Sequence, residues 1–292
     1  MGSNPGNSDS GNSNDFDNND SVSAWLIRLL KGAFIGSAFI VPGMSGGALA
    51  AVFGLYERMI MFMANITKDF KKNVLFFLPV GIGGALGIFV FAVFLSFLFE
   101  AAEVQLKWLF IGCIAGTLPS MWKQAKRDGR RPVHIAALVL SFAGAILFLR
   151  FISRAAGGAL PLTPYTWTIA GAITALGAIV PGLSSSNLLL FLQMYHPMLE
   201  GIAGFDLRML LPFGTGGVIT ILIFARFMAL AFKKAYGMLF HSIIGFVLAS
   251  TALIVPINYN YLSIGGLLSV FAAVAGVLLA LWICRLEERY RM

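Results

Sequence analysis

From position 24 to position 284 the chain is a succession of long apolar segments separated by short polar loops. An α-helix needs about 20 apolar residues to cross the ~30 Å hydrocarbon core of a bilayer. Hydrophobic residues make up 58% of the chain and charged residues 12%, about half the charged fraction of a soluble domain. The pattern therefore excludes a soluble enzyme and predicts an all-α polytopic membrane protein.

Six of the apolar segments are long enough to cross a bilayer as uninterrupted helices. Polar residues dominate the start of the chain, so residues 1–23 are expected to form a disordered tail that stays on the cytoplasmic side. Residues 285–292 form a short polar end, which we also expect in the cytoplasm. The predicted spans are 74–99, 105–121, 133–152, 209–232, 237–256 and 262–284.

Two further apolar stretches, 25–62 and 165–199, are each interrupted near the middle. The breaks contain Pro42-Gly43 and Pro181-Gly182, each followed by small or polar residues. Proline removes a backbone donor and glycine favours a turn, so a continuous helix is not expected through either break. Each stretch is therefore predicted to be a re-entrant hairpin, whose broken backbone must lie against protein or line a wet cavity.

Basic residues test this topology. With the first hairpin opening to the cytoplasm, 16 Lys and Arg residues fall on the cytoplasmic side and 4 on the outer side, as the positive-inside rule requires. The loop 122–132 carries five of the 16. Both termini are then cytoplasmic. The formal net charge of +8 is explained by topology and lipid headgroups, and a nucleic-acid partner is not indicated.

The two halves of the chain resemble each other. Val-Pro-Gly-Met-Ser at 41–45 pairs with Val-Pro-Gly-Leu-Ser at 180–184, and this register places Glu57 opposite His196. Later segments pair as 78–81 with 211–214, 91–94 with 224–227, and 111–112 with 244–245. Each repeat contains one hairpin and three spans, so the second copy is predicted to be inverted, as in many transporters. Repeat 1 covers 24–131 with the third span 133–152, and repeat 2 covers 165–284.

The residues after each break have the composition of an anion site. A helix that starts inside a membrane offers unpaired N–H groups and the positive end of its dipole. Small residues let an oxyanion approach that backbone, and hydroxyls add donors. In the alternative, they only allow close helix packing, with Ser hydroxyls bonded to neighbouring carbonyls; two symmetric loops favour the anion site. The candidate phosphate ligands are Ser45, Gly46, Gly47, Ser184, Ser185, Ser186 and Asn187.

A few ionisable residues are candidates for a function beyond setting the topology. Arg226 lies inside a predicted span and is a candidate phosphate ligand, or a cation that snorkels to the headgroups. Glu57 and His196 are candidates for proton coupling or counter-charge, or else interface residues. Arg150 and Arg154, one helical turn apart on the outer side, are candidates for capturing an anionic headgroup in the outer leaflet, although interface anchoring also explains them.

The motifs 42–47, Gly54-Leu55-Tyr56-Glu57, 181–184, Tyr195 and Pro197 together resemble the bacterial polyprenyl-phosphate transporter family. The resemblance covers about 24–284. It implies a cytoplasmic-membrane protein that carries undecaprenyl phosphate from the outer to the inner leaflet for reuse in cell-envelope synthesis, with the two Pro-Gly loops cradling the phosphate and the prenyl tail in the lipid. His196 departs from the acid expected after the second Tyr.

Two other functions stay open at this point. An undecaprenyl diphosphate phosphatase would share the hairpins and the Pro-Gly-x-Ser loops, but its chemistry calls for a loop Arg and clustered acids, which the loops lack. The spacing of the motifs does not exclude a transporter of a small soluble anion. Cys113 and Cys284 lie in apolar runs and indicate neither a disulfide nor a metal site. No cofactor is expected, and nothing in the sequence indicates the oligomeric state.

Overall fold

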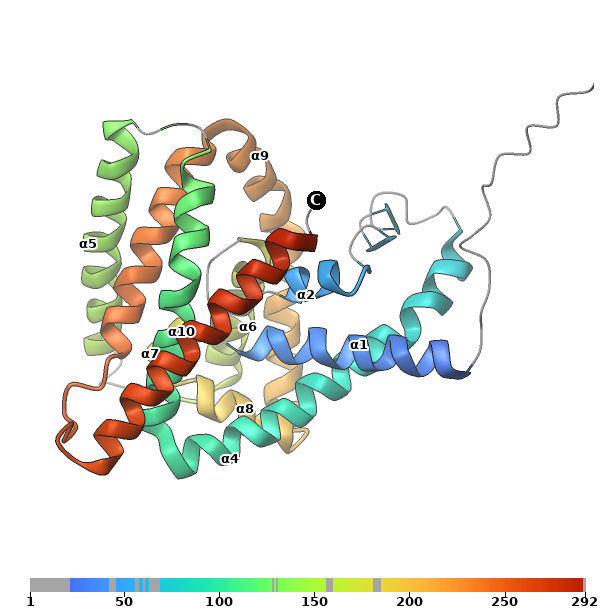
Figure 1. Ribbon diagram of the computed structural model, residues 1–292, viewed down its shortest axis with the longest axis horizontal. Coiled ribbons are helices and arrows are strands. Elements are labelled where there is room, and N and C mark those ends of the chain that lie inside the picture. The colour runs from blue at the N-terminus through green and yellow to red at the C-terminus, as the bar shows by residue number, and fades with distance from the viewer. Residues whose placement is uncertain are drawn as a thin grey trace, which may run out of the picture.

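The computed structural model describes residues 22–41, 46–55, 58–59, 61–62, 69–127, 129, 131–155, 160–180 and 185–290 (Figure 1). Within these ranges the chain forms helices and short connections, without strands. The helices are α1 (Val22–Ile40), α2 (Gly46–Val52), α4 (Phe70–Ala125), α5 (Pro132–Ala155), α6 (Pro164–Ile179), α7 (Ser185–Phe191), α8 (Tyr195–Ala203), α9 (Leu207–Ile254) and α10 (Ile264–Tyr290).

Six stretches of the described helices are long and apolar enough to cross a membrane, so the predicted all-α, multi-pass architecture is confirmed. The six helical stretches are not the same six segments that the sequence predicted as spans. Val22–Ile40 is included, although it belongs to the first predicted hairpin, and Phe70–Ala125 counts once because it contains both 74–99 and 105–121. Large apolar side chains such as Phe97, Leu140 and Leu222 are exposed along these helices, as contact with lipid requires.

The two longest helices each bend at one residue. Ala102 in α4 has φ −152° and ψ 51°, and Ala235 in α9 has φ −144° and ψ 45°. These bends fall between the predicted spans, and they are 133 positions apart, the same separation as the sequence pair Phe91 and Phe224. In Figure 1, α4 bends at the lower edge of the molecule and α9 at the upper edge. The two bends therefore occupy corresponding positions in the sequence alignment of the halves, while the inverted orientation of the second half stays a prediction.

Close contacts recur in the two halves at matching positions. The helix α1 packs on the first arm of α4, and α6 packs on the first arm of α9. A Cβ built on Gly83 would lie 1.9 Å from the carbonyl oxygen of Leu29, and one built on Gly216 would lie 1.9 Å from that of Thr168. Glycine is therefore required where these helices touch backbone to backbone.

The last helix of each half packs against the other half. The helix α10 runs along α4, and α5 runs along α9. A Cβ on Gly112 would lie 2.0 Å from the carbonyl oxygen of Ala273 in α10, and one on Gly245 would lie 2.2 Å from that of Leu138 in α5. Each half therefore contributes its last helix to the packing of the other half.

Side-chain contacts gather the predicted cytoplasmic segments at one end of the molecule. The ammonium of Lys123 lies 2.8 Å from a carboxylate oxygen of Glu288, and the Arg127 guanidinium lies 5.2 Å from the centre of the Tyr236 ring. At the opposite bend, Gln105 Nε2 donates to the hydroxyl of Tyr259 over 3.1 Å. These contacts fit the predicted topology, while the orientation in the membrane stays a prediction.

Candidate functional site

The end of α1, directly before the first break, is bonded to the second half of the chain. The backbone carbonyl of Ile40 accepts a 3.1 Å hydrogen bond from the Ser186 hydroxyl and a 2.9 Å hydrogen bond from the Tyr195 hydroxyl. All three residues are buried. A helix C-terminus leaves its last carbonyls without intrahelical partners, so these two hydroxyls supply bonds that α1 cannot make itself. The regions around the two breaks therefore meet in the core.

Asn187 lies next to this link and is fully buried. Its Nδ2 donates to the Thr251 hydroxyl over 3.0 Å, and that hydroxyl donates to the Val247 carbonyl over 2.7 Å. Its Oδ1 is buried and has no hydrogen-bond partner among the described residues. An unpaired buried acceptor costs about 1–3 kcal/mol, so an apolar residue would be expected here if packing alone decided the residue.

The predicted phosphate ligands fall partly on residues that the structure describes. Ser185 opens α7 and is partly buried, whereas Gly46 opens α2 and is buried, with its Cβ position 2.6 Å from the ring of Phe39. Gly47 is the second residue of α2. The Ser186 hydroxyl donates to the Ile40 carbonyl, as expected if the serines after the break serve helix packing. Outside the described residues lie Pro42, Gly43, Ser45, Glu57, Pro181, Gly182 and Ser184.

The predicted arginine sites are exposed in this structure. Arg226 lies on the first arm of α9 and makes no hydrogen bond or ion pair with a described residue. Arg150 and Arg154 are exposed near the end of α5. Ser153 between them lines the cavity described next, but neither arginine does. The structure therefore does not join these cations to the link at Ile40.

A cavity of about 690 Å³ opens where α4 bends. The segment between α7 and α8 forms one wall, and the end of α9 forms another. Lys107 and Ser153 lie on the predicted outer side, so the cavity faces the predicted exterior. Its lining residues are Phe99, Glu100, Glu103, Lys107, Ser153, Leu190, Phe191, Gln193, Tyr195, His196, Pro197, Leu253, Ile254, Val255 and Pro256.

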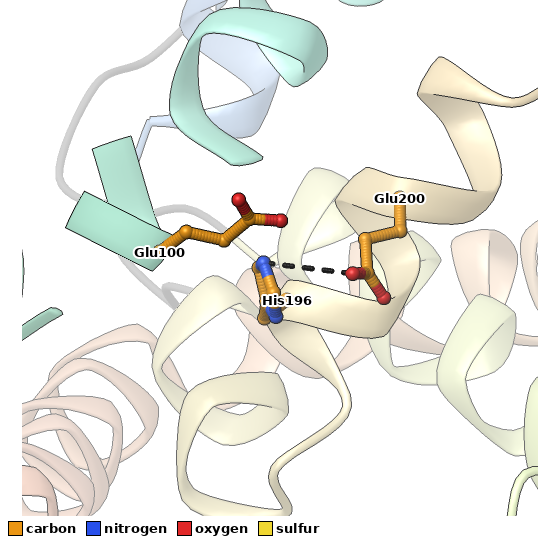
Figure 2. Close-up of side chains that lie close together, drawn as sticks. All are labelled: Glu100, His196 and Glu200. Atoms are coloured by element: carbon orange, nitrogen blue, oxygen red, sulfur yellow. Dashed lines mark ion pairs between the residues drawn. The ribbon is translucent and has the colours of Figure 1, made fainter. Parts of the chain in front are cut away.

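Three ionisable side chains converge beside this cavity (Figure 2). Glu100 comes from α4, whereas His196 and Glu200 come from α8. One ligand atom from each lies within 4.8 Å of the others, and His196 Nε2 lies 3.9 Å from Glu200 Oε1. The Phe99 ring stacks on the imidazole with centroids 4.9 Å apart and planes 15° apart. The histidine predicted for proton coupling or counter-charge thus lies between two carboxylates.

The two carboxylates were not identified from the sequence. Glu200 follows His196 by four residues, a spacing that puts both side chains on one helical face. The sequence alone therefore indicates that these two side chains are neighbours. Glu100 had no local signal. It reaches His196 because α8 packs on α4 next to the bend at Ala102, a contact between segments almost a hundred residues apart.

Comparisons with known proteins identify the family of this chain. A family model described as undecaprenyl phosphate translocase-like matches residues 35–265. A polyprenyl-phosphate transporter of Vibrio cholerae serotype O1 is 30% identical over 224 residues, which cover 72% of this chain and 71% of that protein. A polyprenyl-phosphate transporter of Staphylococcus aureus is 25% identical over 243 residues, covering 79% of this chain and 86% of that protein. No solved structure matches.

Proposed function

We propose a transport function from the premise that this chain belongs to the undecaprenyl phosphate translocase-like family. The protein moves undecaprenyl phosphate, or a related polyprenyl phosphate, across the bacterial cytoplasmic membrane. Net movement runs from the outer to the inner leaflet, where the lipid carrier is reused for cell-envelope synthesis. The curated relatives in Vibrio cholerae and Staphylococcus aureus are named polyprenyl-phosphate transporters, which supports the substrate class.

The observation that carries the proposal is the bonded link between the two breaks. In transporters built from inverted repeats, the substrate site lies where interrupted helices of the two halves meet. Here the carbonyl of Ile40, at the edge of the first break, accepts from Ser186 and Tyr195 of the second half. The Ile40 carbonyl is a polar group in an apolar core, and burying such a group without a hydrogen bond is costly.

We place the phosphate between the two breaks, with Ser45, Gly46, Gly47, Ser184 and Ser185 as donors and Arg226 as a counter-charge. Ser186 and Asn187 already donate to protein acceptors in this conformation. Phosphate therefore has to take over these donors, so that the bonds to Ile40 and Thr251 open as the substrate enters. Exchange of one set of bonds for another gives the protein two states of similar energy, as alternating access requires.

The cavity offers a route by which a headgroup can enter. It opens beside the bend of α4, on the predicted outer side, and reaches Tyr195, which bonds to Ile40. A phosphate entering here would meet the link from the outer leaflet, while exposed apolar side chains such as Phe97 and Leu222 leave the prenyl tail in lipid. Proton coupling through Glu57 or His196 stays a prediction.

One observation keeps the phosphatase as a second candidate. Glu100 and Glu200 lie close together beside the cavity, and an acidic pair of this kind is absent from the Pro-Gly-x-Ser loops themselves. The described residues that line the cavity include no arginine, and Lys107 is paired with Glu103, so no protein cation among them is free to bear charge on a phosphoryl group. Transport is therefore the proposal that the described groups support better.

The full-length protein in liposomes provides the test. A fluorescent prenyl phosphate is placed in both leaflets, and an impermeant quencher reports how much reaches the outside with time. We expect transport at least tenfold faster than in protein-free liposomes, with competition by short-chain prenyl phosphate but not by inorganic phosphate. Transport no faster than in empty liposomes would refute the proposal. Competition by inorganic phosphate would favour a small-anion transporter, and phosphate release from undecaprenyl diphosphate would favour the phosphatase.

A further inference from the structure

We propose that Glu100, His196 and Glu200 bind a divalent transition-metal ion such as Zn²⁺ at the mouth of the cavity. The three side chains supply one imidazole nitrogen and two carboxylates from α4 and α8 (Figure 2). This ligand set belongs to no step of transport described above. It also crosses between the two halves of the chain, because Glu100 is in the first half and the other two are in the second.

The distances are close to those of a coordination sphere. Zn–N and Zn–O bonds are about 2.0–2.2 Å long, so neighbouring ligand atoms in a tetrahedral site lie about 3.5 Å apart. His196 Nε2 and Glu200 Oε1 are 3.9 Å apart, and all three ligand atoms lie within 4.8 Å of one another. Both glutamates are exposed, so rotation of their side chains can close the remaining gap without moving the helices.

The unpaired nitrogen of His196 is an independent observation. Nε2 is buried and has no hydrogen-bond partner among the described residues, and its 3.9 Å separation from Glu200 exceeds hydrogen-bond distance. The stacked Phe99 ring fixes the plane of the imidazole and keeps this nitrogen aimed at the carboxylates. A bound metal ion would satisfy the nitrogen at that position.

The ligand types identify the class of ion. Mg²⁺ and Ca²⁺ prefer all-oxygen sites with six or more ligands. Imidazole suits Zn²⁺ and its first-row neighbours, and two carboxylates beside one imidazole form a three-ligand set that leaves a position open. The cavity adjoins the site, so a water molecule or a substrate oxygen can occupy the open position.

A role for the ion follows if the proposed transport function holds. Lys107 is paired with Glu103 over 2.5 Å, so it does not neutralise Glu100 and Glu200. The negative charges of Glu100 and Glu200 at the mouth of the cavity would repel a lipid phosphate. A bound divalent cation cancels their charge and offers its open position to a phosphate oxygen, so the metal would assist capture of the headgroup.

Metal binding can be measured without lipid substrate. The full-length protein, purified in detergent and stripped with a chelator, is titrated with Zn²⁺ by calorimetry and with Co²⁺ by visible absorption. We expect one ion per chain, and at least about tenfold weaker binding after His196→Gln, Glu100→Gln or Glu200→Gln. Glu288→Gln is the matched control, because it removes an exposed carboxylate that pairs with Lys123 at the other end of the molecule and should leave the affinity unchanged.

The controls separate the possible results. Thermal unfolding of the metal-free variants establishes that each one folds, and the two exposed glutamates keep the test informative if His196→Gln fails to fold. Binding that is absent, or that is equal in wild type and all three variants, overturns the site. If Zn²⁺ does not bind but liposomes transport prenyl phosphate, only the metal site is wrong. If Zn²⁺ binds as expected and transport is absent, only the proposed function is wrong.

Discussion

The hydroxyl of Tyr195 donates a 2.9 Å hydrogen bond to the backbone carbonyl of Ile40, 155 positions earlier in the chain. Tyr195 is 1% exposed and Ile40 is 5% exposed, so the bond is largely shielded from bulk water. The contact ties the last turn of α1 to the start of α8. It makes the region around the first break depend on the second half of the protein.

Removing the donors at Ile40 should destabilise the protein. Tyr195→Phe deletes one bond and should lower the free energy of unfolding by about 1–2 kcal/mol. Adding Ser186→Ala leaves the carbonyl without either donor, so the double variant should lose more than the sum of the single losses. Unfolding midpoints in detergent measure both effects. Tyr165→Phe, at a tyrosine that is 75% exposed, is the control, and an equal shift there would argue against the link.

Asn187 should be needed for transport and dispensable for stability. Asn187→Leu removes the unpaired buried Oδ1, and Thr251 keeps its bond to the Val247 carbonyl. We expect an unchanged or higher unfolding midpoint together with at least a tenfold loss of prenyl phosphate transport in liposomes. Full transport by this variant would show that Asn187 serves packing only.

The proposed phosphate ligands make a combined prediction. Ser45→Ala with Ser184→Ala removes a hydroxyl from each break, and Arg226→Gln removes an exposed arginine of α9. The triple variant should transport prenyl phosphate at least tenfold more slowly than wild type, because the charge-assisted bonds to the headgroup are lost. Arg208→Gln, another exposed arginine of α9, serves as the control. Wild-type rates in the triple variant would eliminate this site.

Close helix packing predicts different effects for neighbouring glycines. Alanine at Gly83 or Gly216 would place Cβ 1.9 Å from a backbone carbonyl oxygen, so each variant should lose at least about 2 kcal/mol of stability. Gly81 and Gly214, two residues earlier on the same helices, have nothing within 4 Å of the Cβ position. Alanine there should be neutral or slightly stabilising. Yield and unfolding midpoint after purification distinguish the two pairs.

Single cysteines test the topology. In a Cys284→Ser background, Leu262→Cys should react with an impermeant maleimide in intact cells, because Leu262 is fully exposed beside the predicted outer loop. Lys126→Cys should react only after the cells are permeabilised, because its loop carries the cytoplasmic charge cluster. The remaining Cys113 is buried. The opposite labelling pattern would invert the proposed orientation and the direction in which the cavity opens.

The sequence was informative where the physical cause is local or periodic. Membrane-length apolar runs located the helices, and Pro-Gly pairs located the breaks after Ile40 and before Ser185. The gaps between predicted spans coincide with the bends of α4 and α9 at Ala102 and Ala235, although the continuous helices were not predicted. His196 was selected through its match to Glu57. Its partner Glu100 was missed, because no periodicity connects two helices so distant in sequence.

The sequence by itself determined that this chain is helical and has helices of membrane-spanning length, because bilayer thickness and backbone hydrogen bonding leave few alternatives for such apolar runs. Only the tertiary structure decided which helices touch. It showed that α5 and α10 each pack on the other half, that Ser186 donates to Ile40, and that Glu100 lies beside His196. These contacts depend on backbone surfaces that fit together at glycine, and that fit is a property of the folded chain.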